Sequence, residues 1–170
     1  AAEASYETSY YAALPEVEVE EQLRHADVIA TGRERRQIGD LATMEQKRDF
    51  LVEFWRRRDE NPATPINETR RAFYERIQYV QDRYSNAYGE GWETDRGRVI
   101  LKYGYPSQVD PNLYDAEALP HEIWEYDNIP GTGQALFVFV DRTGFGDFEL
   151  LHSNVTGELS APDWQSRIRR

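Results

Sequence analysis

The sequence predicts an α+β fold in which N-terminal helices, including a helical hairpin, pack on a C-terminal antiparallel sheet of about four strands. Two observations predict it: apolar residues recur at helical spacing up to about residue 90, and at the two-residue spacing of strands afterwards. The length of 170 residues is enough for one domain with a sizeable core. We expect an extended arm over residues 1–16 and one domain over 17–170, with a helical part (17–90) and a sheet part (91–160).

The predicted arm contains small residues and three tyrosines, without a helical or strand period. We expect it to order only on a partner, as an extended segment. Its tyrosines are candidate docking residues, because tyrosine concentrates binding energy at interfaces: Tyr6, Tyr10 and Tyr11. The chain begins Ala-Ala-Glu, which suits trimming by a signal peptidase and equally trimming of an expressed fragment.

Three helices follow in the prediction. The first runs from Val17 to about Arg35, where Val19, Leu23, Ala26 and Ala30 share one face. The second starts after Thr43, which with Gln46 resembles a capping box. For the third we expect Thr64 to be the cap and Pro65 the first residue, and its apolar stripe is Ile66, Phe73, Ile77, Val80 and Tyr84. The last two helices form the predicted hairpin.

Four strands are predicted after Gly91: Arg98–Tyr103, His121–Asp127, Ala135–Asp141 and Asp147–His152. The third is apolar on both faces, so we expect it at the centre of the sheet. Residues 142–146 contain two glycines and predict a hairpin loop. Pro162, Asp163 and Trp164 indicate a short terminal helix starting at Ser160 or Ala161.

Composition excludes several classes of function. The chain has no cysteine, which excludes disulfides, thiolate metal sites and cysteine nucleophiles. Its net charge is −11, with −10 in residues 84–165 alone, which argues against nucleic acid and anionic membranes as partners. No apolar stretch is long enough to span a bilayer. The 22 aromatic residues argue against a disordered chain.

Few residues are candidates for chemistry. The three histidines lack metal-ligand spacing, and residues 110–117 resemble only half of a calcium loop. Phosphate-binding glycine motifs and nucleophile elbows are missing. What remains is pairs of carboxylates, Glu125 with Asp127 and Asp141 with Asp147, in a chain where 31 acidic residues make such pairs common by chance. We therefore predict no catalytic residue, no cofactor and no metal.

The segment Gly91-Trp92-Glu93-Thr94-Asp95 resembles the motif that names the GWxTD domain family of bacterial proteins. Other stretches resemble the family in order and spacing, from Phe50 to Asp59, from Pro62 to Glu68, and from Tyr103 to Pro106, so that the resemblance covers about residues 43–165. The chain departs from the pattern at Tyr105 and at Ser107-Gln108. The resemblance implies no assigned reaction, and it implies export from the cytoplasm.

Two interpretations of the GWxTD segment remain open. In one it is a structural corner: Gly91 and Gly97 permit unusual backbone angles, Asp95 accepts N–H groups of the turn, and Arg96 or Arg98 pairs with it. In the other it is a recognition surface. The candidate residues for both are Trp92, Asp95, Arg96, Arg98, Asp141 and Arg142.

We expect the chain to be a non-enzymatic protein-interaction module, an extrinsic accessory subunit of a larger bacterial cell-envelope or membrane-associated complex. Its partners would be proteins, with no nucleic acid and no direct insertion into the membrane, and its location would be extracytoplasmic. The alternative is an extracytoplasmic hydrolase or carbohydrate-binding protein with a carboxylate pair in a cleft lined by Trp92 or Trp124.

Overall fold

The computed structural model describes the backbone of residues 2–170 and the side chains from residue 8 onward. The chain divides into two compact units, Ala1–Arg76 and Ile77–Arg170, and the boundary falls within helix α5 (Glu68–Tyr84). In the described residues six of the seven α-helices precede the four strands, which confirms the predicted α+β class. The predicted division into an arm and one domain stays a prediction, because compactness does not report independent folding.

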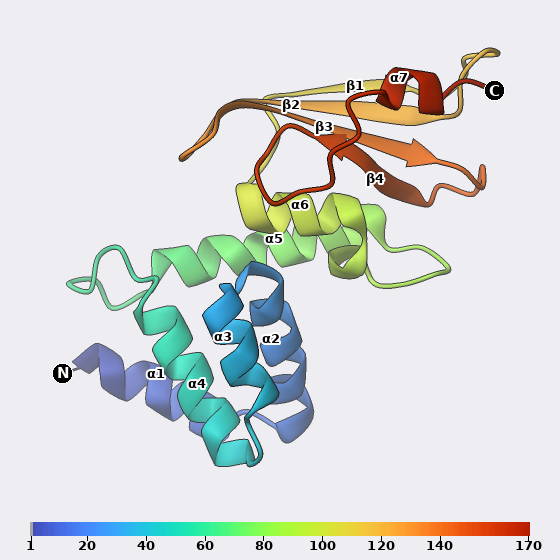
Figure 1. Ribbon diagram of the computed structural model, residues 1–170. Helices are drawn as coiled ribbons and strands as arrows, with labels where there is room; N and C mark the ends of the chain where they lie inside the picture. The colour runs from blue at the N-terminus through green and yellow to red at the C-terminus, as the bar shows by residue number, and fades with distance from the viewer. Residues whose placement is uncertain (1) are drawn as a thin grey trace. The chain divides into compact units, whose positions relative to one another are not determined.

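The first unit is helical throughout (Figure 1). It contains α1 (Ala2–Ala13), α2 (Glu16–Ile29), α3 (Gly32–Gly39), α4 (Met44–Arg56) and the start of α5. Its core joins α2, α4 and α5 through Val19, Leu23, Leu51, Phe54, Trp55 and Phe73, all buried.

The prediction of an extended arm is wrong for residues 2–13, which form α1. Alanine, the best helix former, recurs in this segment, but a helix this short is marginal without tertiary contacts. Tyr11 supplies such a contact, because its side chain is completely buried in the first unit. The sequence did not predict this helix because it has no long apolar stripe. Its buried contacts come mainly from Tyr11 and from Leu14, which follows the helix.

Two helix boundaries also differ from the prediction. The first predicted helix is interrupted after Ile29, because Thr31 starts α3 with a capping box completed by Glu34. Helix α5 begins at Glu68 and not at Pro65, because the Asn67 side chain accepts the Arg70 N–H at 2.9 Å and acts as its cap. The capping box of Thr43 and Gln46 at the start of α4 is confirmed.

The second unit contains the end of α5, a 3₁₀ turn η1 (Gly91–Glu93), α6 (Asp95–Tyr103), four strands and α7 (Trp164–Arg167). The predicted strand Arg98–Tyr103 is wrong, because this segment is part of α6. Thr94 caps α6 by accepting the Gly97 N–H, and three consecutive apolar residues, Val99 to Leu101, are buried. The β-branched side chains of Val99 and Ile100 favour a strand only weakly, and this cap and packing override that preference.

The strands form one antiparallel sheet in the order β1-β2-β3-β4. They are β1 (Gln108–Asn112), β2 (His121–Ile129), β3 (Gly133–Asp141) and β4 (Phe148–Ser153). The central position of β3 is confirmed, and so is the hairpin loop between β3 and β4. Strand β1 was not predicted, since Pro111 interrupts a strand pattern and is tolerated because β1 lies at an edge.

Helices lie on both faces of this sheet (Figure 1). On the face toward α6, the ring of Phe137 lies 5.3 Å from that of Tyr103, and Trp124 lies 4.7 Å from Phe139. On the other face, Val138, Val140, Leu151 and Ile168 form a buried cluster against which Trp164 of α7 packs. The short terminal helix is thus confirmed, and it starts at Trp164, three or more residues later than predicted.

Candidate functional site

The GWxTD corner, residues 91–97, is held by very close backbone contacts. A Cβ atom at Gly91 would lie 1.9 Å from the carbonyl oxygen of Val80 in α5. A Cβ atom at Gly97 would lie 2.0 Å from the carbonyl oxygen of Gly91. Neither glycine has a positive φ, so the predicted reason for them, unusual backbone angles, is wrong. They are small because α5, η1 and α6 touch backbone to backbone.

Thr94 and Asp95 fix the start of α6. The Thr94 hydroxyl donates to the Gly91 carbonyl at 2.7 Å while it accepts the Gly97 N–H at 3.0 Å. The Asp95 carboxylate accepts the Leu150 N–H at 2.7 Å, from the edge strand β4. The prediction that Asp95 accepts N–H groups of its own turn is therefore corrected: it tethers α6 to the sheet.

Arg96 links the corner to the sheet and to the β3–β4 loop. Its guanidinium lies 3.1 Å from Glu122 of β2 and donates to the Gly146 carbonyl at 3.3 Å. The same group lies over the rings of Tyr84 and Phe148, at 4.6 and 4.3 Å from their centroids. Only 12% of the side chain is exposed, so a planar cation is enclosed between two rings and one carboxylate.

Asp141, at the end of β3, organises the β3–β4 loop. Its buried carboxylate accepts the N–H groups of Thr143, Gly144 and Gly146 at 2.7–3.0 Å, and also the Thr143 hydroxyl. Burial raises the pKa of Asp141, but these hydrogen bonds outweigh it and hold the pKa below its usual value. The glycines have φ of 76° and 85°, which other residues rarely adopt.

Arg98 forms a third connection, between α6 and the segment after β4, which the sequence did not reveal. It pairs with Glu158 at 2.9 Å and lies 3.7 Å from Asp95. The Glu158 side chain is only 4% exposed and also accepts Lys102 and Tyr103, both at 2.6 Å. Burial raises the pKa of Glu158, but the bonds from Lys102 and Tyr103 and the charge of Arg98 lower it overall. Glu158 therefore binds the segment after β4 to α6.

The structure brings together most of the candidate residues. Asp95, Arg96 and Arg98 lie in the first two turns of α6, and Arg96 reaches the loop that Asp141 organises. Trp92 is buried in the second unit, while Arg142 is half exposed and lies 3.9 Å from Glu149. Asp95, Arg96, Arg98 and Asp141 are thus engaged within the molecule, and Arg142 is the one whose charge faces solvent.

The family model of the GWxTD domain matches residues 4–162. The chain belongs to the GWxTD domain family. The match starts some 40 residues earlier than the resemblance in the sequence indicated, so the GWxTD domain includes the helices of the first unit. Searches of curated proteins and of solved structures return no match to the chain.

The tyrosines of the predicted docking arm lie inside the GWxTD domain. Tyr11 donates to the Gln22 side chain at 3.1 Å and accepts Arg70 at 3.2 Å, and Tyr74 donates to the same Gln22 oxygen. Tyr10 accepts the Gln22 amide at 3.0 Å and lies beneath the Arg70 guanidinium. Tyr11 is therefore buried and Tyr10 partly buried by contacts within the first unit, the docking role stays a prediction, and the side chain of Tyr6 lies outside the described residues.

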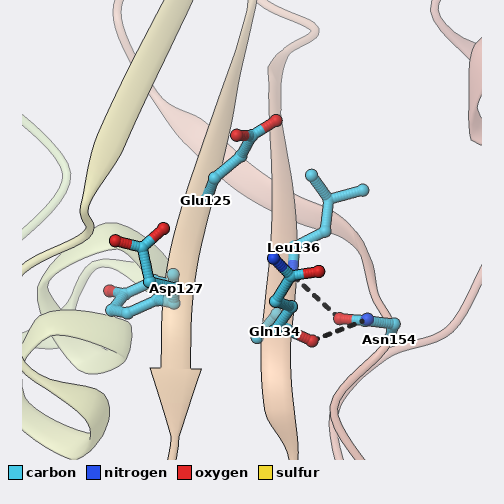
Figure 2. A pocket seen from close by; sticks show the side chains of 7 residues that line it. Glu125, Asp127, Gln134, Leu136 and Asn154 are labelled. Atoms are coloured by element: carbon cyan, nitrogen blue, oxygen red, sulfur yellow. Dashed lines mark hydrogen bonds between the residues drawn. The ribbon is translucent and has the colours of Figure 1, made fainter.

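The predicted carboxylate pair lines a surface hollow of about 230 Å³ on the sheet. Figure 2 shows Glu125 and Asp127 along β2, opposite Gln134, Leu136 and Asn154. No tryptophan lines this hollow, and both Trp92 and Trp124 are buried. The arrangement therefore lacks the tryptophan lining of the predicted hydrolase or carbohydrate site.

The histidines have structural contacts. His121 Nδ1 lies 2.8 Å from the Leu119 carbonyl oxygen, and His152 Nδ1 accepts the Ala161 N–H at 3.0 Å. His25 is buried in the first unit, where desolvation and the charge of Arg24 lower its pKa to about 4. It is therefore neutral at pH 7, and its 3.9 Å separation from Glu21 is not an ion pair there.

Among the described residues no group of three His, Asp or Glu side chains is placed to hold a metal.

Two exposed aromatic residues near the corner were not singled out in the sequence. Tyr88 and Phe145 are 65% and 77% exposed, on the loop after α5 and on the β3–β4 loop. Both loops project from the same end of the second unit (Figure 1). Gly89 follows Tyr88, and Gly144 and Gly146 flank Phe145, so aromatic residues in glycine-bearing turns were the signal available. In the described part of the chain, no helix has the length and apolar character needed to cross a bilayer.

Proposed function

We propose that this GWxTD domain is a non-enzymatic protein-interaction module, which acts as an extrinsic accessory subunit of a bacterial cell-envelope or membrane-associated complex outside the cytoplasm. One observation carries the proposal: two exposed aromatic side chains, Tyr88 and Phe145, stand on loops that the domain holds in fixed conformations. Tyrosine and other large aromatic residues supply much of the binding energy at protein interfaces.

The loop of Phe145 is organised before any partner arrives. Asp141 binds three N–H groups of this loop, and Phe145 itself donates its N–H to the Thr143 hydroxyl at 3.2 Å. Arg96 holds the Gly146 carbonyl from outside the loop. An ordered loop loses little conformational entropy on binding, so more of the contact energy of its aromatic ring appears as affinity.

The loop of Tyr88 has similar support. Asn86 and Gly89 form an antiparallel bridge, with the Asn86 N–H donating to the Gly89 carbonyl at 3.1 Å. The Tyr88 N–H donates to the Asn86 side chain at 2.8 Å. The backbone below the tyrosine is therefore a closed turn, although the ring itself is mostly in solvent.

Charge indicates the kind of partner. Residues 84–165, which include both loops, have a net charge of −10. A partner with a basic surface would be drawn to this unit and oriented by it, because complementary charge accelerates encounter and sets the register of docking.

The test is recovery of the chain from native membranes after mild cross-linking, with the double variant Tyr88→Ser and Phe145→Ser beside the wild type. We expect a discrete complex for the wild type and at least a tenfold lower yield for the variant, since two central aromatic contacts are each worth about 2 kcal/mol. Cell fractionation of the same material checks the location outside the cytoplasm.

The matched control is Val17→Ser in the first unit, where Val17 is 73% exposed. This variant should keep the complex. All three proteins should have the same melting temperature, because the replaced side chains are mostly in solvent. A double variant that keeps the complex in full contradicts a role of this surface, and a wild type recovered only as free monomer contradicts the proposed function itself.

A further inference from the structure

We infer that the hollow between the Tyr88 loop and the β3–β4 loop receives an arginine or lysine side chain of the protein partner. This inference rests on the proposed function and names the chemistry that the partner presents. The hollow, of about 120 Å³, is lined from one side by residues 86–94 and from the other by Asp147, two residues after Phe145. It thus lies where the two loops that carry the exposed rings meet.

The lining of this hollow is anionic. Three carboxylates, Glu90, Glu93 and Asp147, contribute to it, and no lysine or arginine does. Glu93 accepts the Glu90 N–H at 3.3 Å, and Glu90 accepts the Gln81 amide. Within the described residues the Asp147 carboxylate has no hydrogen bond or ion pair, although its residue is only partly exposed. A cation in the hollow would supply the partner that this carboxylate lacks.

The volume of the hollow and the aromatic residue in its lining limit which group can occupy it. Pockets for small-molecule ligands usually exceed roughly 300 Å³, so this hollow admits the head of one long side chain and not a whole ligand. Tyr88 is among the lining residues, and a guanidinium or ammonium gains energy over an aromatic face. The apolar stem of such a side chain would leave the hollow beside the exposed rings.

The GWxTD corner fixes the distance between the two walls. Thr94 lines the hollow and at the same time caps α6. Two residues further on, Arg96 binds the Gly146 carbonyl, directly before Asp147. One short segment therefore holds both loops, and the motif that defines the family also contributes Glu93 and Thr94 to the lining of the proposed binding site.

The experiment is an NMR titration of the whole chain with N-acetyl-arginine methylamide, compared with the citrulline analogue, which has nearly the same shape and no charge. We expect saturable shifts of the amide signals of residues 86–94 and 145–147 with the arginine probe alone. Asp147→Asn, which keeps the size of the side chain, should weaken the apparent affinity about threefold, as expected for loss of one exposed ion pair. Asp110→Asn, an exposed site on β1, should leave it unchanged.

Equal shifts with both probes, shifts spread over the whole acidic surface, or an unchanged affinity for Asp147→Asn would each overturn the inference. These results are independent of the cross-linking test. If the aromatic double variant loses the native complex while the arginine probe does not bind, the proposed function stands and the inference fails. If the probe binds while the double variant keeps the complex, the hollow is a cation site and the proposed docking surface is refuted.

Discussion

Gly91 and Gly97 show how single hydrogen atoms in place of side chains determine the corner. Each lies so close to a backbone carbonyl oxygen that a Cβ atom in place of the hydrogen would overlap with it. The neighbouring atoms belong to the backbone of α5 and of η1, which cannot move aside as a flexible side chain does. The requirement for glycine is therefore steric and follows from the packing of three segments, not from the turn alone.

Gly97→Ala should destabilise the domain by about 2 to 3 kcal/mol, because the added methyl group forces α6 away from Gly91. The measurement is the free energy of unfolding in urea. Gly39→Ala is the matched control, since a Cβ atom there has no neighbour within 4 Å and φ is not positive. A Gly97→Ala protein as stable as the control would show that the close contact is not maintained in solution.

At the scale of elements, three side chains connect α6 to four other parts of the second unit. Asp95 binds β4, Arg96 binds β2 and the β3–β4 loop, and Arg98 binds the segment that contains Glu158. All three lie in the first two turns of the helix, where they follow the Thr94 cap. The first two turns of α6 thus hold β2, β4, the β3–β4 loop and the segment of Glu158 to one short helix.

Asp95→Ala should cost about 1 to 3 kcal/mol, since it leaves the Leu150 N–H without its acceptor. It should also raise hydrogen exchange at Leu150 by at least tenfold relative to the wild type. Asp110→Ala, in exposed β1, is the control and should change neither quantity. Stability loss without faster exchange at Leu150 would argue that Asp95 acts only through Arg98.

Local signals explain which elements could be predicted. Helix α4 and the β3–β4 hairpin were predicted because a capping box and a glycine-bearing loop are encoded within a few residues. Helix α6 was predicted as a strand, because Arg98–Tyr103 has strand-like composition and its real determinants, Gly91, Gly97 and the Asp95 bond, depend on distant segments. Glu158 was missed for the same reason, since its partners lie 55 to 60 residues away in the sequence.

The candidate site was predicted in part. The corner residues of α6 and Asp141 were identified from their types and spacing, and the structure joins them through Arg96. Asp147 was linked only to Asp141, as a carboxylate pair, and Tyr88 and Phe145 were not linked to the site at all, because nothing in the sequence indicates that the loop after α5 and the β3–β4 loop lie against each other. For Tyr10 and Tyr11 of α1, nothing in the sequence indicates their contacts with Gln22 and Arg70, which belong to the same unit.

For the whole molecule, the buried ionisable groups predict how stability depends on pH. His25 has an ordinary pKa of 6.5 when unfolded and about 4 when folded, so the unfolded chain binds more protons in this interval. Stability from this group is complete above pH 6.5 and is lost as pH falls toward 4. At pH 5.5 the loss should be about 1.4 kcal/mol, measured by urea unfolding against pH 7.5.

His25→Leu should remove the contribution of His25 to this difference and leave that of His152, whose pKa burial also lowers. Glu34→Gln is the control: the Arg58 hydrogen bonds lower the pKa of Glu34 to about 2, so its contribution is lost only between pH 4.5 and 2. That variant should be less stable at both pH values and keep the difference. A His25→Leu protein with the wild-type difference would assign the titration to another group.

The two-faced packing of β3 has a consequence for partial unfolding. One face of its run from Ala135 to Val140 is covered by Trp164 and Ile168, which come more than twenty residues later in the sequence. When this later segment detaches, a strongly β-forming apolar strand is uncovered on that side, and such segments associate readily with other chains. Local opening of α7 therefore makes the sheet prone to aggregation.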